Sequence, residues 1–386
     1  MSEPLRLSAV QSPIIPVIAD LIRAHPGTIS LGQGVVHYGP PPAAFARLES
    51  FAADSANHKY QSVAGLPVLL ESIAGKMAAE NAVRIGGENR AMVTVGGNQG
   101  FFNAVLAIAD PGDEFILPTP CYFNQEMAVT MASCRPVLVP TDAHHQLQLD
   151  RLRAAITPRT RAIITVSPQQ PDRCGLSGSR LARSEPALQR TRHLSHSRRG
   201  LRILHLRRGP ALFPASIAGS AAHTISLFSL SKAYGFASWR IGWMVFPADL
   251  ESAMRKIQDT VLICPTVISQ FAALGALEAG AAYVREKLRG IAEVRALVRS
   301  ELSGLSDICD VPPAQGAFYF LLRVRADRPS LEMAERLIRE HRVAAIPGNA
   351  FGLDHGCHLR VAYGALQPDT AAEGMARLAR GLRALT

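Results

Sequence analysis

The chain has 386 residues, of which 48% are hydrophobic, so it can bury a large core in one or two domains. No apolar run approaches the roughly 18 residues that cross a bilayer, and residues 1–24 lack a basic segment followed by an apolar one, so we expect a cytoplasmic protein without membrane partners. The six cysteines have no CxxC or CxxH spacing, so we expect neither a metal site nor a disulfide framework.

The net charge of +10 is concentrated in residues 169–208, which contain ten arginines, no lysine and two acidic residues. A strip that binds nucleic acid usually mixes lysine with arginine and adds aromatic side chains that stack on bases. This segment has no Phe, Tyr or Trp. We therefore do not expect nucleic acid as a partner.

Outside that segment, predicted strands alternate with predicted helices, as in an α/β protein with a mainly parallel sheet. The first strand runs into glycines and is followed by a stretch with helical spacing over residues 99–110. The predicted strands of the sheet are, in chain order, 91–97, 114–120, 161–168 and 223–231. No internal repeat interrupts this alternation.

The C-terminal part of the chain is predicted to be helix-rich from residue 250 onward. A long amphipathic stretch covers residues 269–302. Residues 316–324 and 358–364 are predicted strands of a smaller C-terminal unit.

The stretch SLSKAYGFASWRIG, residues 229–242, places a lysine directly after a buried-looking strand. Lys232 is one of five lysines in a chain with 36 arginines, and an ammonium group in an apolar site is costly unless it is used. Such an amine can form a Schiff base with an aldehyde. Ser229 and Arg240 lie close enough in sequence to bind one phosphate group beside it. These residues alone leave open a second interpretation, an exposed loop lysine with a surface arginine.

The stretch around Lys232 resembles the lysine motif of the class I/II pyridoxal-phosphate aminotransferases, which have fold type I. Other stretches match the family in order over nearly the whole chain: ISLGQG, KYQSVAGLP, VTVGGNQGFFNA, LPTPCYFN and HLRVAYG. The resemblance implies a three-layer α/β/α large domain with a mainly parallel sheet over residues 45–280. It also implies a smaller α+β domain built from residues 1–44 and 281–386.

The resemblance implies a role for each matched residue. Lys232 would form the Schiff base with pyridoxal 5′-phosphate and then carry the proton between the substrate Cα and the cofactor C4′. Tyr122 would stack on the pyridine ring, Gly34 would face the substrate, and Arg360 would bind the substrate α-carboxylate with its guanidinium fork. In a homodimer, Tyr60 would reach the phosphate of the partner subunit. The remaining phosphate-binding residues would be Gly97, Asn98, Ser229 and Arg240.

Residues 169–208 depart from the family pattern. After a strand such as 161–168 the family has NNPTG, whose second asparagine binds the cofactor phenolic oxygen, whereas this chain has QQPDRCG with Gln170 at that place. Further on, the family has D-E-A-Y, whose aspartate keeps the pyridine nitrogen protonated. This chain has HSRRGLRILHLRR there, with no carboxylate.

Both missing motifs appear in one alternative reading frame. If QQPDRCG is encoded by CAA CAA CCC GAC CGG TGC GGT, a shift of one base reads Asn-Asn-Pro-Thr-Gly-Ala. With suitable synonymous codons for RRGLRILHL, the same shift reads Asp-Glu-Ala-Tyr-Glu-Tyr-Phe-Thr. We therefore interpret residues 169–208 as translated out of frame. The rival interpretation is a relative that has lost its site and serves as a binding or regulatory protein.

The expected reaction is transamination between an L-amino acid and a 2-oxo acid, impaired in the chain as written. The same apparatus supports β- or γ-elimination, as in a C–S lyase, because the fold does not determine the reaction. The motifs do not identify the amino acid.

Overall fold

The structure is a computed structural model that describes residues 4–167, 202–207 and 220–386, apart from residues 313, 315 and 317. Its main sheet has seven strands in the order β2-β8-β7-β6-β5-β3-β4, and β8 alone runs antiparallel to its neighbours. The strands are β2 (Asn89–Thr94), β3 (Glu114–Thr119), β4 (Arg135–Pro140), β5 (Thr160–Ser167), β6 (Arg202–Arg207), β7 (Thr224–Ser229) and β8 (Gly242–Pro247). The four predicted strands are therefore β2, β3, β5 and β7.

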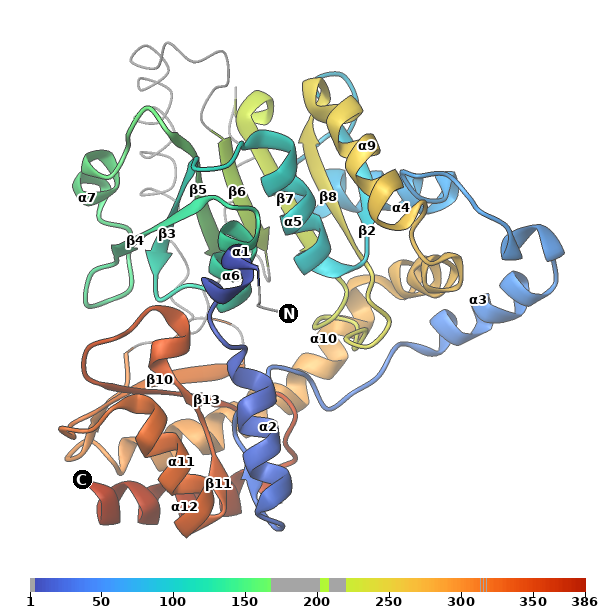
Figure 1. Ribbon diagram of the computed structural model, residues 1–386. Coiled ribbons are helices and arrows are strands. Elements are labelled where there is room, and N and C mark those ends of the chain that lie inside the picture. The colour runs from blue at the N-terminus through green and yellow to red at the C-terminus, as the bar shows by residue number, and fades with distance from the viewer. Residues whose placement is uncertain (1–3, 168–201, 208–219, 313, 315, 317) are drawn as a thin grey trace.

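Helices cover both faces of this sheet, so its strands are apolar on both sides (Figure 1). All six residues of β3 and of β8 are buried. One face packs against α5 (Gly96–Ile108), α6 (Phe123–Met131) and α9 (Glu251–Leu262). The other face packs against α4 (Pro67–Asn81), α7 (Leu149–Ala154) and the first part of α10 (Val267–Ser303). The result is a three-layer α/β/α arrangement, with α3 (Pro42–Ala52) packed on α10.

A second core lies around a small antiparallel sheet of order β12-β13-β10-β9. Its strands are β9 (Cys309–Asp310), β10 (Tyr319–Val324), β12 (Ile346–Pro347) and β13 (Cys357–Ala362). The two predicted C-terminal strands are β10 and β13. The helices of this core are α2 (Ile14–Ala24), α11 (Ser330–His341), α12 (Pro368–Leu385) and the second part of α10. A short parallel pair, β1 (Ile29–Ser30) and β11 (Val343–Ala344), brings the N-terminal segment to this core.

The remaining described elements are short. Helix α1 (Leu5–Ser8) lies beside α6, and four 3₁₀ turns cover η1 (Ser55–His58), η4 (Ala221–His223), η5 (Ala248–Leu250) and η6 (Gly348–Phe351).

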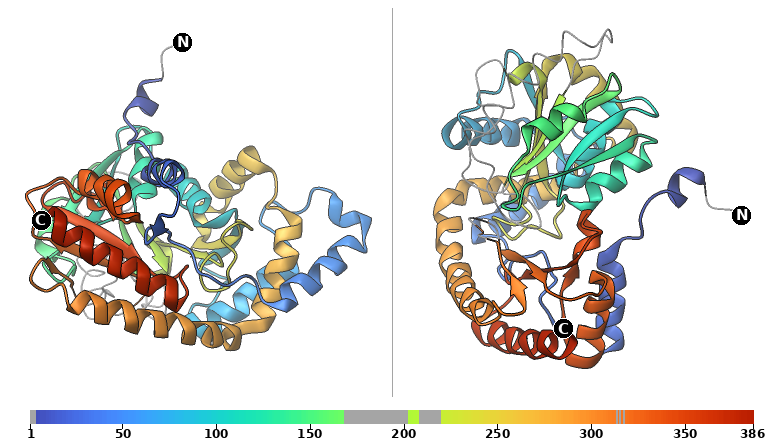
Figure 2. Two further views of the ribbon diagram at one scale, coloured as in Figure 1. Left: turned by 90° about the horizontal axis from the view of Figure 1, so that it is seen from below. Right: turned by 90° about the vertical axis from the view of Figure 1, so that its left-hand side faces the viewer.

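Helix α10 contains the predicted amphipathic stretch and contributes to both cores (Figure 2). It bends at Gly280, which has φ 61° and ψ −159°, a conformation outside the helical region that glycine adopts without a Cβ penalty. Among the described helices it alone is long and apolar enough to cross a membrane, but core helices also have this property. Its apolar side chains, such as Ala272 and Val298, are buried within the two cores. The division of the chain into domains at residues 44 and 280 stays a prediction.

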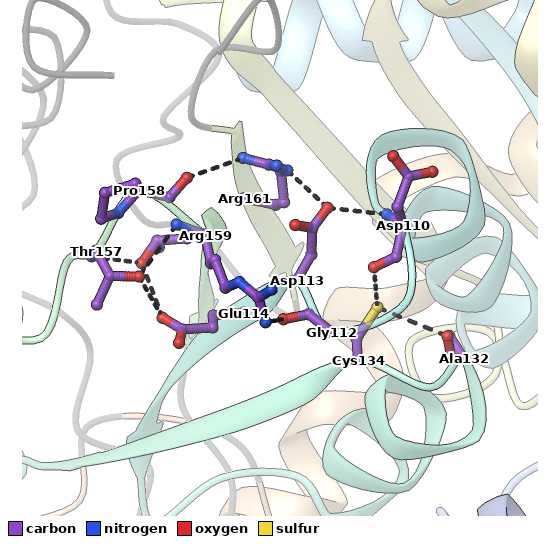
Figure 3. Close-up of polar contacts among 11 residues, drawn as sticks. Asp110, Gly112, Asp113, Glu114, Ala132, Cys134, Thr157, Pro158, Arg159 and Arg161 are labelled. Carbon is purple, nitrogen blue, oxygen red and sulfur yellow. Dashed lines mark hydrogen bonds and ion pairs between the residues drawn. The ribbon is translucent and has the colours of Figure 1, made fainter. Parts of the chain in front are cut away.

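Polar contacts tie together the amino ends of β3 and β5 (Figure 3). Arg161 Nε donates to Asp113 Oδ2 at 2.7 Å, and the same oxygen accepts from the backbone N–H of Asp110 at 2.8 Å. Thr157 Oγ1 donates to Glu114 Oε2 at 2.6 Å. These side chains thus join the amino ends of two strands of the sheet, whereas the carboxyl ends of the strands are the place where open α/β sheets bind ligands.

Candidate active site

A cavity of about 140 Å³ lies at the carboxyl ends of β2, β3, β5 and β7. Parallel strands present the loops that follow them at this edge, so residues far apart in sequence meet there. Six of the residues selected from the sequence line the cavity: Gly97, Asn98, Tyr122, Ser229, Lys232 and Arg240.

The first turn of α5 and Arg240 form an anion-binding corner of the cavity. Helix α5 begins at Gly96, so its first backbone N–H groups have no partner within the helix. A Cβ on Gly96 would lie 2.6 Å from Arg240 Nη2, so only glycine lets the guanidinium approach the turn this closely. Arg240 has φ 52°, a left-handed conformation that is unfavourable for a side-chain-bearing residue and is commonly kept at functional sites. Positive charge and free N–H groups together suit a phosphate group.

The lysine lies beside two serines at the end of β7. Ser229 Oγ donates to Ser231 Oγ at 2.8 Å and accepts from the backbone N–H of Ser231 at 3.1 Å. Lys232 is half-buried, and its Nζ donates to the carbonyl oxygen of Gly34. The amine therefore lies in the cavity rather than in an exposed loop.

Arg360 of the small sheet approaches Gly34, the residue that Lys232 contacts. It lies on β13 and is 3% exposed, and its Nη2 donates to the carbonyl oxygen of Gly32 at 2.7 Å. A Cβ built on Gly34 would lie 3.8 Å from the same nitrogen. Gly34 thus contacts Lys232 with its carbonyl group and leaves room beside the guanidinium of Arg360.

Tyr122 precedes α6 and is half-buried, and its hydroxyl oxygen accepts a hydrogen bond from Asn124 Nδ2 at 2.8 Å. Tyr60 does not line the cavity and is 78% exposed. Gln170 lies outside the described residues.

Three cavity-lining polar residues, Asn124, Gln125 and Ser231, were not selected from the sequence. Asn124 and Gln125 lie within three residues of Tyr122, and Ser231 is adjacent to Lys232. That proximity was the available signal, but it does not reveal that Asn124 bonds to Tyr122 or that Ser231 bonds to Ser229.

The profile of the family described as aminotransferase class I and II matches residues 26–173 and 208–378. The chain belongs to this family. It is a pyridoxal-phosphate-dependent aminotransferase of fold type I, as the sequence motifs predicted.

Similar proteins cover most or nearly all of this aminotransferase. An aromatic aminotransferase of Arabidopsis thaliana is 28% identical over 98% of this chain and 96% of its own. A probable aspartate/prephenate aminotransferase of Thermus aquaticus is 33% identical over 84% of each chain. The structure of the aspartate aminotransferase from Thermus thermophilus with maleate superposes with a TM-score of 0.89 at 26% identity, covering 99% of this chain and 100% of that one.

Proposed function

We propose that this aminotransferase transfers the amino group of an L-amino acid to a 2-oxo acid, with Lys232 as the amine that binds the cofactor aldehyde. The observation that carries the proposal is that Lys232 Nζ donates to the carbonyl oxygen of Gly34, while a Cβ built on Gly34 would lie 3.8 Å from Arg360 Nη2. A nucleophilic amine and a guanidinium fork therefore lie near one backbone position. An amino acid held by its carboxylate at Arg360 would present its Cα toward Lys232.

The residues of the cavity fit pyridoxal phosphate. Gly97, Asn98, Ser229 and Arg240 would hold the phosphate group at the first turn of α5. Tyr122 would lie against the ring. When bound, the cofactor supplies an electron sink for the negative charge that develops at the substrate Cα.

The chain's own residues would perform the remaining steps. Lys232 would accept the proton from the substrate Cα and would then return a proton, so that one positioned group would act as base and then as acid. Arg360 fixes the orientation of the Cα–H bond by binding the α-carboxylate in a bidentate manner. The half-buried position of Lys232 limits the access of water to the amine.

We further propose a homodimer in which Tyr60 completes the phosphate site of the partner subunit. This is supported by its position: an aromatic side chain 78% exposed, outside its own cavity, in the segment where the family resemblance expects a shared residue.

We also propose that residues 169–208 are an out-of-frame translation that impairs the enzyme. The family profile matches up to residue 173 and resumes at residue 208, and this supports the proposal because the unmatched interval lies within the segment. The described part of that interval, Arg202–Arg207, forms the central strand β6 between β5 and β7. Sequencing the gene across codons 165–212 is the test. A verified frame with the present codons would contradict the proposal and favour a degenerate relative.

The reaction is tested by product analysis with 2-oxoglutarate. The relatives are named for aromatic amino acids and for aspartate, so phenylalanine and aspartate are the first donors to compare. Glutamate formation that depends on the donor would support transamination. A donor with a leaving group at Cβ, such as cysteine, tests the alternative, because ammonia and pyruvate formed from it without 2-oxoglutarate would indicate elimination.

A further inference from the structure

Gln258 is a fully buried polar residue on α9 and is 0% exposed. It does not line the cavity. Its Nε2 donates to the carbonyl oxygens of Val63 and Val93, each at 2.8 Å. Its Oε1 accepts from Gln99 Nε2 and Asn103 Nδ2, each at 3.2 Å. All four hydrogen-bonding positions of the carboxamide are used. If the amide were rotated by 180°, its NH₂ group would face the NH₂ groups of Gln99 and Asn103, and its oxygen would face the two carbonyl oxygens.

Gln99 connects this residue to the phosphate corner. Gln99 Oε1 accepts from the backbone N–H of Val95 at 3.0 Å, and Val95 is the N-cap residue directly before α5. Because Gln258 engages the Nε2 of Gln99, it holds the Oε1 of Gln99 toward Val95. The side-chain amides of Gln99 and Gln258 therefore hold the turn that leads into Gly97 and Asn98.

The same carboxamide of Gln258 also holds the segment that carries Tyr60. Val63 lies three residues after Tyr60, and Val93 lies on β2. One buried side chain thus joins the turn at the start of α5, the adjacent strand and the Tyr60 segment.

We propose that Gln258 is a positioning residue for phosphate binding, acting through Gln99 on the first turn of α5. It touches neither substrate nor cofactor. The inference rests on the proposed role of Gly97 and Asn98 in holding the phosphate group.

The test uses the full chain carrying Gln258→Met, which keeps the approximate volume and removes the four hydrogen bonds. The probes are inorganic phosphate and pyridoxal, which has the ring and aldehyde without the phosphate, each measured by calorimetric titration. We expect phosphate affinity to fall about fivefold, the effect of losing one typical hydrogen bond that orders the site, and pyridoxal affinity to stay unchanged.

Gln270→Met is the matched control. Gln270 is also 0% exposed, and it binds the backbone N–H of Leu66 and the carbonyl oxygen of Pro265, each at 2.8 Å. None of the hydrogen bonds described for it reaches α5. We expect this variant to lower the melting temperature while phosphate affinity stays that of the unaltered chain.

A double-mutant cycle tests the route through Gln99. Gln99→Met alone should weaken phosphate binding, and adding Gln258→Met should weaken it no further, because both changes remove the same support. Gln99 is half-buried, so its variant provides the measurement even where Gln258→Met fails to fold. Unchanged phosphate affinity in Gln99→Met, or equal losses of phosphate affinity in Gln258→Met and Gln270→Met, would overturn the role of Gln258 but not the phosphate site. An unaltered chain that binds no phosphate would overturn the proposed phosphate site as well.

Discussion

Arg360 illustrates how a single buried cation is prepared for an anionic substrate. Its guanidinium carbon lies 4.9 Å from the ring centre of Tyr319 and 5.2 Å from that of Phe351, and one nitrogen is bonded to the carbonyl oxygen of Gly32. A buried guanidinium is costly unless rings, carbonyl groups or anions compensate for its lost hydration. The two rings restrict the plane of the group, so the orientation of the fork is set before a carboxylate arrives.

Replacing Arg360 by lysine should raise the KM for the amino donor about tenfold or more, because a point charge cannot reproduce two parallel hydrogen bonds. Steady-state kinetics at saturating 2-oxoglutarate measures the change. Arg323→Lys, on the exposed side of the neighbouring strand β10, is the control and should leave the KM unaltered. An unchanged KM in Arg360→Lys would show that the carboxylate binds elsewhere.

At the residue scale, the sequence motifs predicted six cavity-lining residues and the neighbouring pair Gly34 and Arg360. They could not reveal Gln258, because its partners Asn103 and Gln99 are separated from it by 155 and 159 residues. The sequence around a buried glutamine in an amphipathic helix does not indicate which distant residues it will bond to. The exposed position of Tyr60 likewise depends on where its segment packs.

At the scale of elements, strands β3, β5 and β7 were predictable because each is a short segment rich in apolar and β-branched residues. The predicted strand 91–97 ends earlier, at Thr94, because the two glycines open α5 instead of extending the strand. Strand β8 was not predicted. It follows two turns, at residues 231–234 and 237–240, and its first residue, Gly242, was counted as the end of the lysine motif. The two-residue strands β1, β9, β11 and β12 form only through tertiary pairing and have no sequence signature.

The amino edge of the sheet depends on Glu114, the first residue of β3, whose carboxylate is 4% exposed. Burial by itself would raise the pKa of Glu114. The hydrogen bonds from Thr157 and Arg135, together with the charge of Arg135, outweigh burial and lower the pKa below its usual value. The ionised carboxylate therefore stabilises the fold above the pKa of an unfolded glutamate. This stabilisation is lost as the pH falls through the folded-state pKa.

Glu114→Gln should lower the free energy of unfolding at neutral pH by about 1–3 kcal/mol, because the amide cannot accept both sets of hydrogen bonds. Thermal melting at pH 7 and at about pH 3 measures the effect, and the difference from the unaltered chain should shrink at the lower pH. Glu251→Gln removes an ion pair with Arg90 that is about 40% exposed and should change the melting temperature little. A difference for Glu114→Gln that stays constant with pH would show that its charge is unimportant.

At the scale of the whole molecule, the site lies between two cores. Lys232 belongs to the segment packed on the large sheet, whereas Gly34 and Arg360 come from the part built around the small sheet. The α/β alternation predicted the large sheet, and the strand pattern of residues 316–324 and 358–364 predicted a smaller C-terminal unit. The family resemblance added residues 1–44 to that unit. None of these predicted that α10 bends at Gly280 and contributes to both cores, since a glycine inside a helical pattern does not reveal its conformation.

Restoring the alternative frame over residues 169–208 should raise soluble yield, affinity for pyridoxal phosphate and glutamate formation together. The restored segment would supply an asparagine and an aspartate to the cofactor, and it would replace an arginine-rich sequence, which would be costly to bury without partners. Expressing both proteins side by side measures the three quantities. Equal activity in the two would contradict the frameshift interpretation.

Lys232 is the residue on which the proposed function depends, as the amine that binds the cofactor aldehyde. Incubating the chain with pyridoxal phosphate, reducing with borohydride and mapping the modified peptide by mass spectrometry tests this directly, even where turnover is slow. We predict that the pyridoxyl group is found on Lys232 in preference to the other four lysines, and that it disappears from this peptide in Lys232→Ala. Modification spread evenly over the five lysines, or concentrated on another one, would contradict the account.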